Sequence, residues 1–186
     1  MSTVASKTIF TPADLLRLPD EGVGYELLDG QLVERNVSKE SSRIAIEIAR
    51  LLGNEAAKKR DAEIYGSDLG YQCFADDRNR IRRPDVSLIR KDRLKTIDPD
   101  PGFMPIPADL VVEVISPNDN WVQGTRKVEQ YLNAGFGSVW IVDPGTRIVV
   151  IHRADGSVTK LHENDEITGE AALPGFRCRV SEFFVS

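Results

Sequence analysis

A glutamate lies in the middle of an apolar run of the sequence. Glu113 is flanked by Leu110-Val111-Val112 and by Val114-Ile115, a continuous, β-branched pattern that is typical of a buried strand. An ionised carboxylate in such a strand loses several kcal/mol of hydration unless a metal ion, a cation or a proton compensates it. A second acid, Asp85, follows Pro84 at the head of another strand-like segment, 86–89. Two acids on two core strands indicate a site for a divalent metal.

Such a pair of carboxylates suits phosphodiester hydrolysis. The reaction needs an activated water and stabilisation of negative charge on the phosphate and leaving oxygens, and a divalent cation supplies much of both. Magnesium fits because one or two protein carboxylates hold it while water positions stay open. A lysine nearby can orient the water or stabilise the developing charge. Lys127, on the helix that follows Glu113, is the candidate.

Each of these residues also has a structural interpretation. Glu113 could form a buried ion pair with an arginine or lysine, although such pairs seldom stabilise a fold. Asp85 could bond nearby backbone N–H groups where its strand begins. Lys127 could be a surface lysine on an amphipathic helix. Glu26 lies in an alternating hairpin strand, where an exposed acid is the ordinary interpretation.

A local cluster of arginines precedes Asp85. Its members are Arg78, Arg80, Arg82 and Arg83. The last three are candidates for contact with the phosphate backbone of a nucleic acid at the mouth of the site, and the alternative is a solvated hairpin face. The formal net charge of −5 does not indicate nucleic-acid binding, but a small basic cleft can coexist with an acidic exterior.

Length and composition fit one soluble globular domain. The chain has 186 residues, of which 41% are hydrophobic and 28% charged, as in ordinary globular proteins. We expect a flexible N-terminus over residues 1–10 and a single domain over 11–186. No stretch approaches the roughly 20 apolar residues of a membrane span, and residues 1–7 lack the apolar core of a signal peptide, so a cytoplasmic location is expected. Cys73 and Cys178 lie far apart and imply no disulfide framework.

The elements that must position these side chains follow from turn, cap and periodicity signals. Thr11 and Pro12 predict the start of a short helix, Asp29-Gly30 predicts a hairpin over 25–34, and Ser41 or Ser42 predicts the cap of a helix that runs to about Arg60. Strand-like segments are expected at 62–66, 69–75, 80–90, 110–115 and 139–142, a helix at 121–134, a hairpin over 147–161, and a last strand and short helix after 173–176. This order predicts an α/β (α+β) fold, with a mixed β-sheet flanked by helices and additional β-hairpins.

Several short motifs occur together in one order along the chain. They are Tyr25-Glu26-Leu27-Leu28-Asp29-Gly30-Gln31-Leu32-Val33, Arg83-Pro84-Asp85-Val86-Ser87, Leu110 to Pro117, Lys127 with Tyr131, Val139-Trp140-Ile141-Val142-Asp143-Pro144 and Leu173-Pro174-Gly175-Phe176. In this order they resemble the Uma-type putative restriction-endonuclease family, which belongs to the PD-(D/E)XK nuclease-like superfamily. The resemblance extends from about Thr11 to Phe184. It implies a restriction-endonuclease-like fold, a Mg²⁺ (or Mn²⁺) cofactor, a nucleic-acid substrate with DNA favoured over RNA, and a homodimer.

Carried over residue by residue, the resemblance implies that Asp85 and Glu113 bind the metal and that Glu26 is an additional acid of the site. The superfamily places a lysine two residues after the second acid, where this chain has Ile115, and Lys127 is the candidate replacement. Relatives often carry a histidine at the start of the long helix, where this chain has Glu40-Ser41-Ser42-Arg43. The sequence thus predicts a metal-dependent endonuclease. The alternative is a catalytically inactive nuclease-fold protein that binds nucleic acid or a protein partner.

Overall fold

The computed structural model describes residues 9–95, 97, 102–116 and 121–184, with the backbone alone for 121–123. At its centre lies a six-stranded sheet. Its strands, in spatial order, are β3 (Ala62–Gly66), β4 (Val86–Arg90), β5 (Leu110–Val114), β6 (Ser138–Asp143), β7 (Ile148–Arg153) and β8 (Val158–Leu161). β5 and β6 pair in parallel, and the other neighbours pair antiparallel. The predicted mixed sheet is therefore confirmed.

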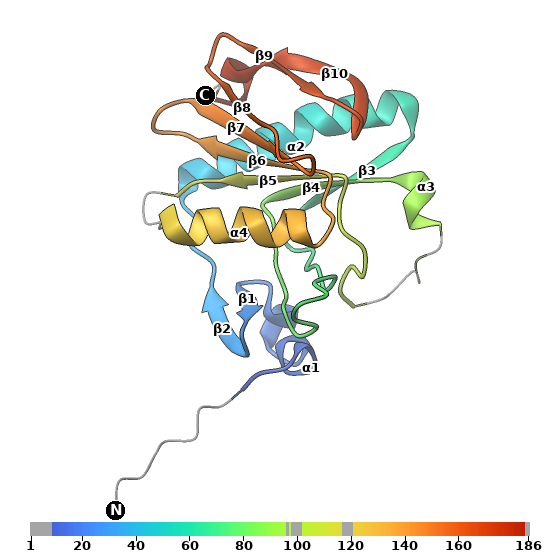
Figure 1. Ribbon diagram of the computed structural model, residues 1–186, viewed down its shortest axis with the longest axis vertical. Helices are drawn as coiled ribbons and strands as arrows, with labels where there is room; N and C mark the ends of the chain where they lie inside the picture. The colour runs from blue at the N-terminus through green and yellow to red at the C-terminus, as the bar shows by residue number, and fades with distance from the viewer. Residues whose placement is uncertain (1–8, 96, 98–101, 117–120, 185–186) are drawn as a thin grey trace, which may run out of the picture.

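Helices cover the two faces of this sheet (Figure 1). The long helix α2 (Lys39–Lys59) lies on one face together with the hairpin of β9 (Glu166–Gly169) and β10 (Leu173–Arg179) and the 3-10 helix η2 (Val180–Phe184). Helix α4 (Trp121–Asn133) lies on the other face and connects β5 to its parallel neighbour β6. The remaining elements are the N-terminal α1 (Pro12–Leu16), η1 (Pro19–Gly22), β1 (Tyr25–Leu28) and β2 (Gln31–Glu34), below the sheet in Figure 1, and α3 (Lys91–Leu94) after β4.

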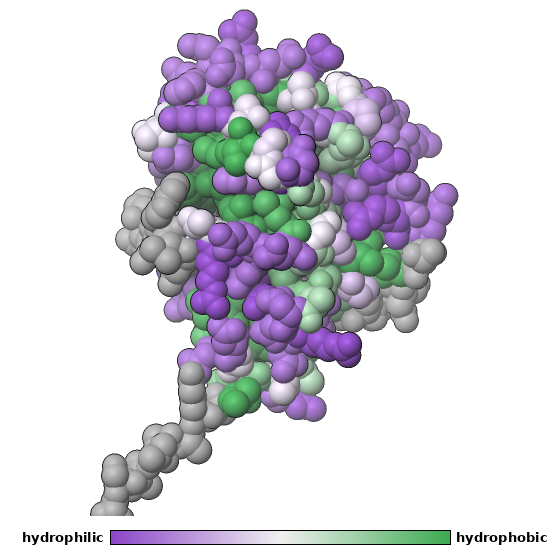
Figure 2. Space-filling view, in the orientation of Figure 1, coloured by the Kyte–Doolittle hydropathy of each residue, from purple (hydrophilic) through white to green (hydrophobic). Residues whose placement is uncertain are grey.

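The alternation of side chains along β5 decides which face Glu113 occupies. Leu110, Val112 and Val114 pack into the core beneath α2, whereas Val111 packs into the core beneath α4. Because successive strand residues point to opposite faces, Glu113 shares the face of Val111 and points toward α4. Helix α4 covers only part of that face. Figure 2 shows, in the same view as Figure 1, hydrophobic residues at mid-height of the molecule and mostly hydrophilic residues above and below them.

The pairing of β4 with β5 brings the two candidate metal ligands together. The strands are antiparallel, with Val86 opposite Val112 and Leu88 opposite Leu110. Continued by one residue, the same register places Asp85 opposite Glu113. Side chains of directly opposite residues lie on the same face of a sheet, with Cβ atoms about 5 Å apart. The pairing of β4 with β5 therefore brings two acids that are far apart in sequence close together in space.

The predicted cap of the long helix, Ser41 or Ser42, was wrong by three or four residues. Helix α2 begins at Lys39, and its N-cap is Ser38, whose side chain accepts a hydrogen bond from the backbone N–H of Ser41. The Ser41 hydroxyl in turn accepts from the Ser38 backbone N–H. A capping box ordinarily has Glu or Gln at its third helical position, and the serine there obscured the signal.

Two predicted strands were also wrong in extent. Residues 69–75 form no strand, because Tyr71 makes only single bridges, to Arg82 and to Met104. Of the segment 80–90, only 86–90 belongs to the sheet. The four-residue β9 was not predicted, and β10 begins at Leu173, four residues earlier than expected, with a register shift before Arg177.

The other predicted elements are confirmed. The hairpin at Asp29-Gly30, the segment 62–66 and the helix at 121–134 all form, and Gly135 follows that helix with φ +89°, a left-handed conformation that glycine adopts easily. The flexible N-terminus falls mostly on residues 1–8, which lie outside the described residues. Within the part of the chain that the structure describes, no helix is both long and apolar enough for a membrane crossing.

Candidate active site

Glu113 has two close partners on helix α4. The Lys127 ammonium donates to Glu113 Oε2 at 2.8 Å, and the Tyr131 hydroxyl donates to Oε1 at 2.7 Å. Lys127 and Tyr131 are one helical turn apart, so both face the sheet from the same stripe of α4. The polar lysine therefore lies on the packed side of the helix, and the alternative of a surface lysine is excluded.

Glu26 on β1 joins the same network from the N-terminal hairpin. Its side chain is buried and accepts hydrogen bonds from the Arg82 guanidinium at 2.7 Å and from the Arg83 backbone N–H at 2.8 Å. It also forms an ion pair with the Lys127 ammonium at 3.3 Å. Burial opposes ionisation of Glu26, but Lys127, Arg82 and these hydrogen bonds outweigh it and lower the pKa of Glu26 to about 2. Glu26 is therefore ionised and is not the exposed acid of the alternative interpretation.

The electrostatic environment of Glu113 has the opposite effect. Burial raises its pKa to about 7, and the negative charges of Asp85 and Glu26 act in the same direction, while Lys127 opposes them. Lys127 thus offsets only part of the effect that burial and the two neighbouring acids have on Glu113. A carboxyl group with a strongly shifted pKa beside other acids is a common feature of functional sites.

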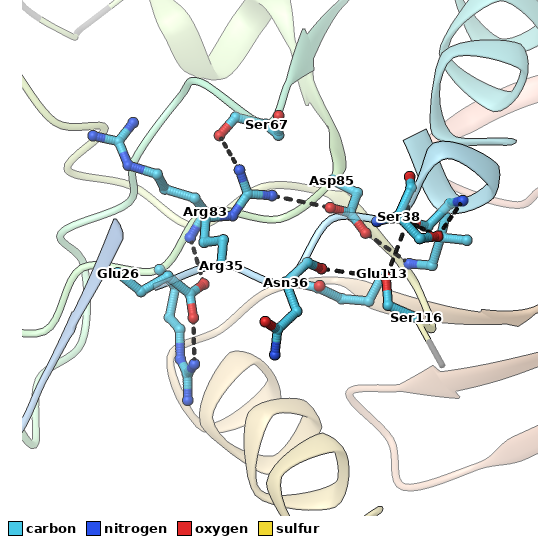
Figure 3. A network of polar contacts seen from close by, with 12 residues as sticks. Glu26, Arg35, Asn36, Ser38, Ser67, Arg83, Asp85, Glu113 and Ser116 are labelled. Carbon is cyan, nitrogen blue, oxygen red and sulfur yellow. Dashed lines mark hydrogen bonds and ion pairs between the residues drawn. The ribbon is translucent and has the colours of Figure 1, made fainter. Parts of the chain in front are cut away.

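Asp85 lies on the other side of Glu113, immediately before β4. Its Oδ2 accepts the backbone N–H of Val114 at 2.8 Å, and its Oδ1 pairs with the Arg35 guanidinium at 3.0 Å. Arg35 also donates to the backbone carbonyl of Ser67 at 3.3 Å. Figure 3 shows these contacts, with Glu26, Asp85 and Glu113 arranged around one polar region. Asp85 does bond backbone N–H, as its structural interpretation predicted, and it also contributes to the acidic group.

A cleft of about 220 Å³ reaches Asp85 from the side of α2. Its walls include Val37 just before α2, Ser42 and Ile46 in the first turns of α2, and Ser67 and Asp68 after β3. Nearby, the Ser41 hydroxyl lies 3.0 Å from the Ser116 hydroxyl, and Ser116 donates to the Asn36 carbonyl at 3.2 Å. The start of the long helix, where the resemblance places a histidine, is therefore held against the end of β5 by serines.

The three arginines that were candidates for phosphate contact are buried. Arg82 binds Glu26 and also Gln130 on α4, and Arg83 donates to the backbone carbonyls of Tyr25, Glu21 and Asp68. Arg80 pairs with Asp76 at 2.8 Å. Local sequence indicated a basic surface, but the guanidinium groups bind acids and carbonyls that the fold brings to them. Because these guanidinium groups are already bound inside the protein, we do not assign phosphate contacts to Arg80, Arg82 and Arg83.

Sequence reasoning missed two contributors to the site. Arg35 follows the second strand of the N-terminal hairpin, and no motif connects it with an aspartate 50 positions away. Gln130 contacts Arg82 from α4 and gives no recognisable signal in the sequence. Ile115, in contrast, stands where the superfamily pattern has lysine, and the structure brings Lys127 to Glu113 from the neighbouring helix instead.

The site offers hard oxygen ligands, although its carboxylates have protein partners. Among the described residues, no three His, Cys, Asp or Glu side chains form a ready metal-binding cluster. Each oxygen of Asp85 and Glu113 accepts one hydrogen bond, and a carboxylate oxygen can accept two. Burial is the main reason that the pKa of Glu113 is raised, and a bound cation would favour its ionised form. The Asp85–Glu113 pair therefore fits a divalent cation.

Comparison with known proteins places this chain in a family. The chain has the fold of a putative nuclease belonging to DUF820 from Anabaena variabilis, whose crystal structure matches with a TM-score of 0.80 at 17% sequence identity, over 94% of this chain and 97% of that one. No curated protein matches the chain. The family model of Uma2, described as putative restriction endonuclease, matches residues 12–181, almost the whole chain. The chain therefore belongs to the Uma2 family of putative restriction endonucleases.

Proposed function

We propose that this protein is a metal-dependent endonuclease that hydrolyses phosphodiester bonds of nucleic acid, with DNA as the favoured substrate. The observation that carries the proposal is the convergence of Asp85, Glu113 and Lys127 where β4, β5 and α4 meet. Membership of a restriction-endonuclease family makes nucleic acid the natural substrate class. Fold alone does not establish activity, so the proposal rests on the chemistry of these side chains.

Asp85 and Glu113 are the residues that would hold Mg²⁺ or Mn²⁺. When bound, such an ion lowers the pKa of a water and neutralises charge on the phosphate oxygens. The chain's own contribution is to fix the two carboxylates. The backbone N–H of Val114 orients Asp85, and the Tyr131 hydroxyl orients Glu113. Both supports come from regular elements, which hold side chains more closely than loops do.

Lys127 supplies the cation that the superfamily pattern places two residues after the second acid. Its pKa is raised because Glu113 and Glu26 stabilise the ammonium form more than burial disfavours it. Lys127 is therefore charged, with its ammonium 2.8 Å from Glu113. From that position it can orient an attacking water or stabilise charge on a phosphate oxygen. Glu26, ionised and buried, keeps the ammonium in place.

The test is cleavage of supercoiled plasmid by the purified protein with Mg²⁺ or Mn²⁺. We expect nicking and linearisation that EDTA abolishes and that Glu113→Gln removes. Glu170→Gln is a matched control, because Glu170 also pairs with a basic side chain, Arg153, but lies outside the site. Wild-type protein that shows no metal-dependent cleavage, or Glu113→Gln protein that cleaves as fast as wild type, would overturn the proposal.

One observation favours a second candidate, a catalytically inactive nuclease-fold protein that binds nucleic acid or a protein. The three acids of the site already have cationic partners in Arg35, Lys127 and Arg82, an arrangement that could serve stability alone. Calorimetric titration separates the two candidates, because a purely structural site would bind neither Mg²⁺ nor Mn²⁺ saturably. The homodimer and the cytoplasmic location expected from the sequence remain predictions.

A further inference from the structure

The cations around the three acids are held to very different degrees. Lys127 bridges two glutamates, and Arg82 binds Glu26 and the amide oxygen of Gln130. Arg83 donates to three backbone carbonyls and does not depend on a carboxylate. All three are therefore fixed by several contacts that do not involve Asp85.

Arg35 is held differently. Its partners within the described residues are Asp85 Oδ1, at 3.0 Å, and the carbonyl oxygen of Ser67, at 3.3 Å, the upper end of the hydrogen-bond range. The principal restraint on this guanidinium is thus the carboxylate that is also a candidate metal ligand. A cation that replaced Arg35 as the partner of Asp85 would leave Arg35 with only the long hydrogen bond to Ser67 among these two contacts.

The surroundings of Arg35 favour an anion once Asp85 is engaged elsewhere. Both partners of Arg35, Asp85 and Ser67, line the cleft beside the site, so the guanidinium lies next to two residues of the cleft wall. The Arg83 guanidinium donates to the backbone carbonyl of Asp68, which also lines the cleft. A phosphate group in the cleft would therefore lie near positive charge, and a guanidinium binds phosphate through charge-assisted hydrogen bonds.

We propose that Arg35 is the phosphate-contacting cation of this site, and that it exchanges its partner between Asp85 and the nucleic-acid backbone. In the metal-free protein it neutralises Asp85. When Asp85 engages a divalent cation, which carries twice the charge of a guanidinium, Arg35 is released to donate to the phosphate oxygens of the bound strand. The inference rests on the proposed function and adds the residue that replaces the buried arginines as the phosphate contact.

The experiment uses Arg35→Gln in the full-length protein and measures two binding reactions. Mn²⁺ affinity is measured by calorimetry without nucleic acid, and the affinity for a short fluorescent DNA duplex is measured against salt concentration with Ca²⁺ in place of Mg²⁺. Loss of the competing guanidinium should raise Mn²⁺ affinity about two- to fivefold. Loss of one phosphate contact should reduce the salt slope of duplex binding by about one.

A matched control and a conservative variant complete the design. Arg93 pairs with Asp109 at 3.0 Å, the same length as the Arg35–Asp85 pair, outside the site. Arg93→Gln should therefore leave both measurements at wild-type values. Arg35→Lys retains the charge and should restore most of the salt slope, which keeps the test informative if the glutamine variant fails to fold.

The outcomes separate this inference from the proposed function. Weaker Mn²⁺ binding by Arg35→Gln with an unchanged salt slope would overturn the inference, because Arg35 would then only position Asp85. The inference would also be overturned if Arg35→Lys folds but its salt slope of duplex binding is reduced by about one, as expected for loss of a phosphate contact. Wild-type protein that binds Mn²⁺ but neither binds nor cleaves the duplex would overturn the proposed function itself.

Discussion

At each end of the antiparallel pair β4–β5, an aspartate precedes one strand and bonds the backbone of the other. Asp85 precedes β4 and accepts the N–H of Val114 at 2.8 Å, and Asp109 precedes β5 and accepts the N–H of Arg90 at 2.8 Å. The two side chains are also exposed to the same extent, 19% for Asp85 and 17% for Asp109. Because the local geometry is the same, any functional difference must come from what surrounds each aspartate.

The residue across the ladder makes that difference. The register of β4 and β5 places Glu113 opposite Asp85, whereas it places the buried Ile89 opposite Asp109. Each aspartate pairs with one arginine at 3.0 Å, and at the Asp109 end that pair satisfies the charge. At the Asp85 end a second carboxylate, Glu113, is buried, and its burial and the nearby charge of Asp85 raise the pKa of Glu113 to about 7. An aspartate that accepts a backbone N–H at the end of the neighbouring strand thus has a structural role. It becomes a candidate metal ligand where a second acid lies opposite it.

Removing the charge of each aspartate is the strongest test of this comparison. Asp85→Asn should reduce cleavage more than about a thousandfold, because even side chains that only support a metal ligand contribute about ten- to a hundredfold. Asp109→Asn should leave cleavage unchanged and lower the free energy of unfolding by about 1 kcal/mol, since it weakens one charged pair. Plasmid cleavage and urea unfolding of both variants check this. Equal loss of cleavage in the two would mean that the shared strand-end bond, and not the site, controls activity.

The cations at the two ends provide the next test. Lys127→Gln leaves the buried Glu26 without one of its cations and Glu113 without its only ammonium partner among the described residues. Above pH 7 we expect a loss of about 3 kcal/mol in the free energy of unfolding, as for other broken buried pairs. Arg93→Gln breaks a pair whose arginine side chain is one-third exposed, so its loss should stay below about 1 kcal/mol.

Urea unfolding with both variants at the same pH gives the comparison. The Lys127→Gln loss should shrink as the pH falls below 7, because Glu113 then takes up a proton and no longer needs the ammonium. Similar losses in Lys127→Gln and Arg93→Gln would show that the two glutamates are solvated enough to need no cation, and that burial does not distinguish the two ends.

The sequence was most informative where a residue conflicted with its neighbours. A carboxylate within a β-branched run is anomalous on its own strand, so Glu113 could be identified without knowledge of the fold. Asp85 and Lys127 needed the additional pattern of the family. The sheet and its flanking helices were predictable because apolar periodicity and turn residues specify them locally.

What could not be predicted depends on contacts between distant segments. The arginine cluster predicts a basic surface, but Arg82 reaches Glu26, 56 positions away, and Arg83 reaches carbonyls of the N-terminal segment. Arg35 carries no local signal, since its role comes from its partner Asp85, 50 positions later. Charge runs report composition along the chain, whereas burial and pairing are decided by the tertiary fold.

The smallest expected effect is the pH dependence of metal binding, and it also separates the two ends of β4–β5. Glu113 faces four titratable groups, which are Asp85 before β4, Glu26 on β1, and Lys127 and Tyr131 on α4. Its pKa of about 7 in the folded chain exceeds the ordinary value of 4.5. Between these values the folded protein holds a proton that the unfolded chain has lost, so the metal-free protein loses stability as the pH rises through this window.

Mn²⁺ should reverse that trend, because it binds the ionised form of Glu113 and displaces the proton. We expect Mn²⁺ affinity to rise with pH and to level off above about 7, with about a fivefold decrease over the first pH unit below that midpoint. Calorimetry in buffers of different ionisation enthalpy would count the released proton. Glu113→Gln should abolish the proton release, whereas Asp109→Asn should leave it unchanged. A flat pH profile in the wild-type protein would mean that Glu113 is already ionised without metal, and that the acid opposite Asp85 is neutralised by Lys127 alone.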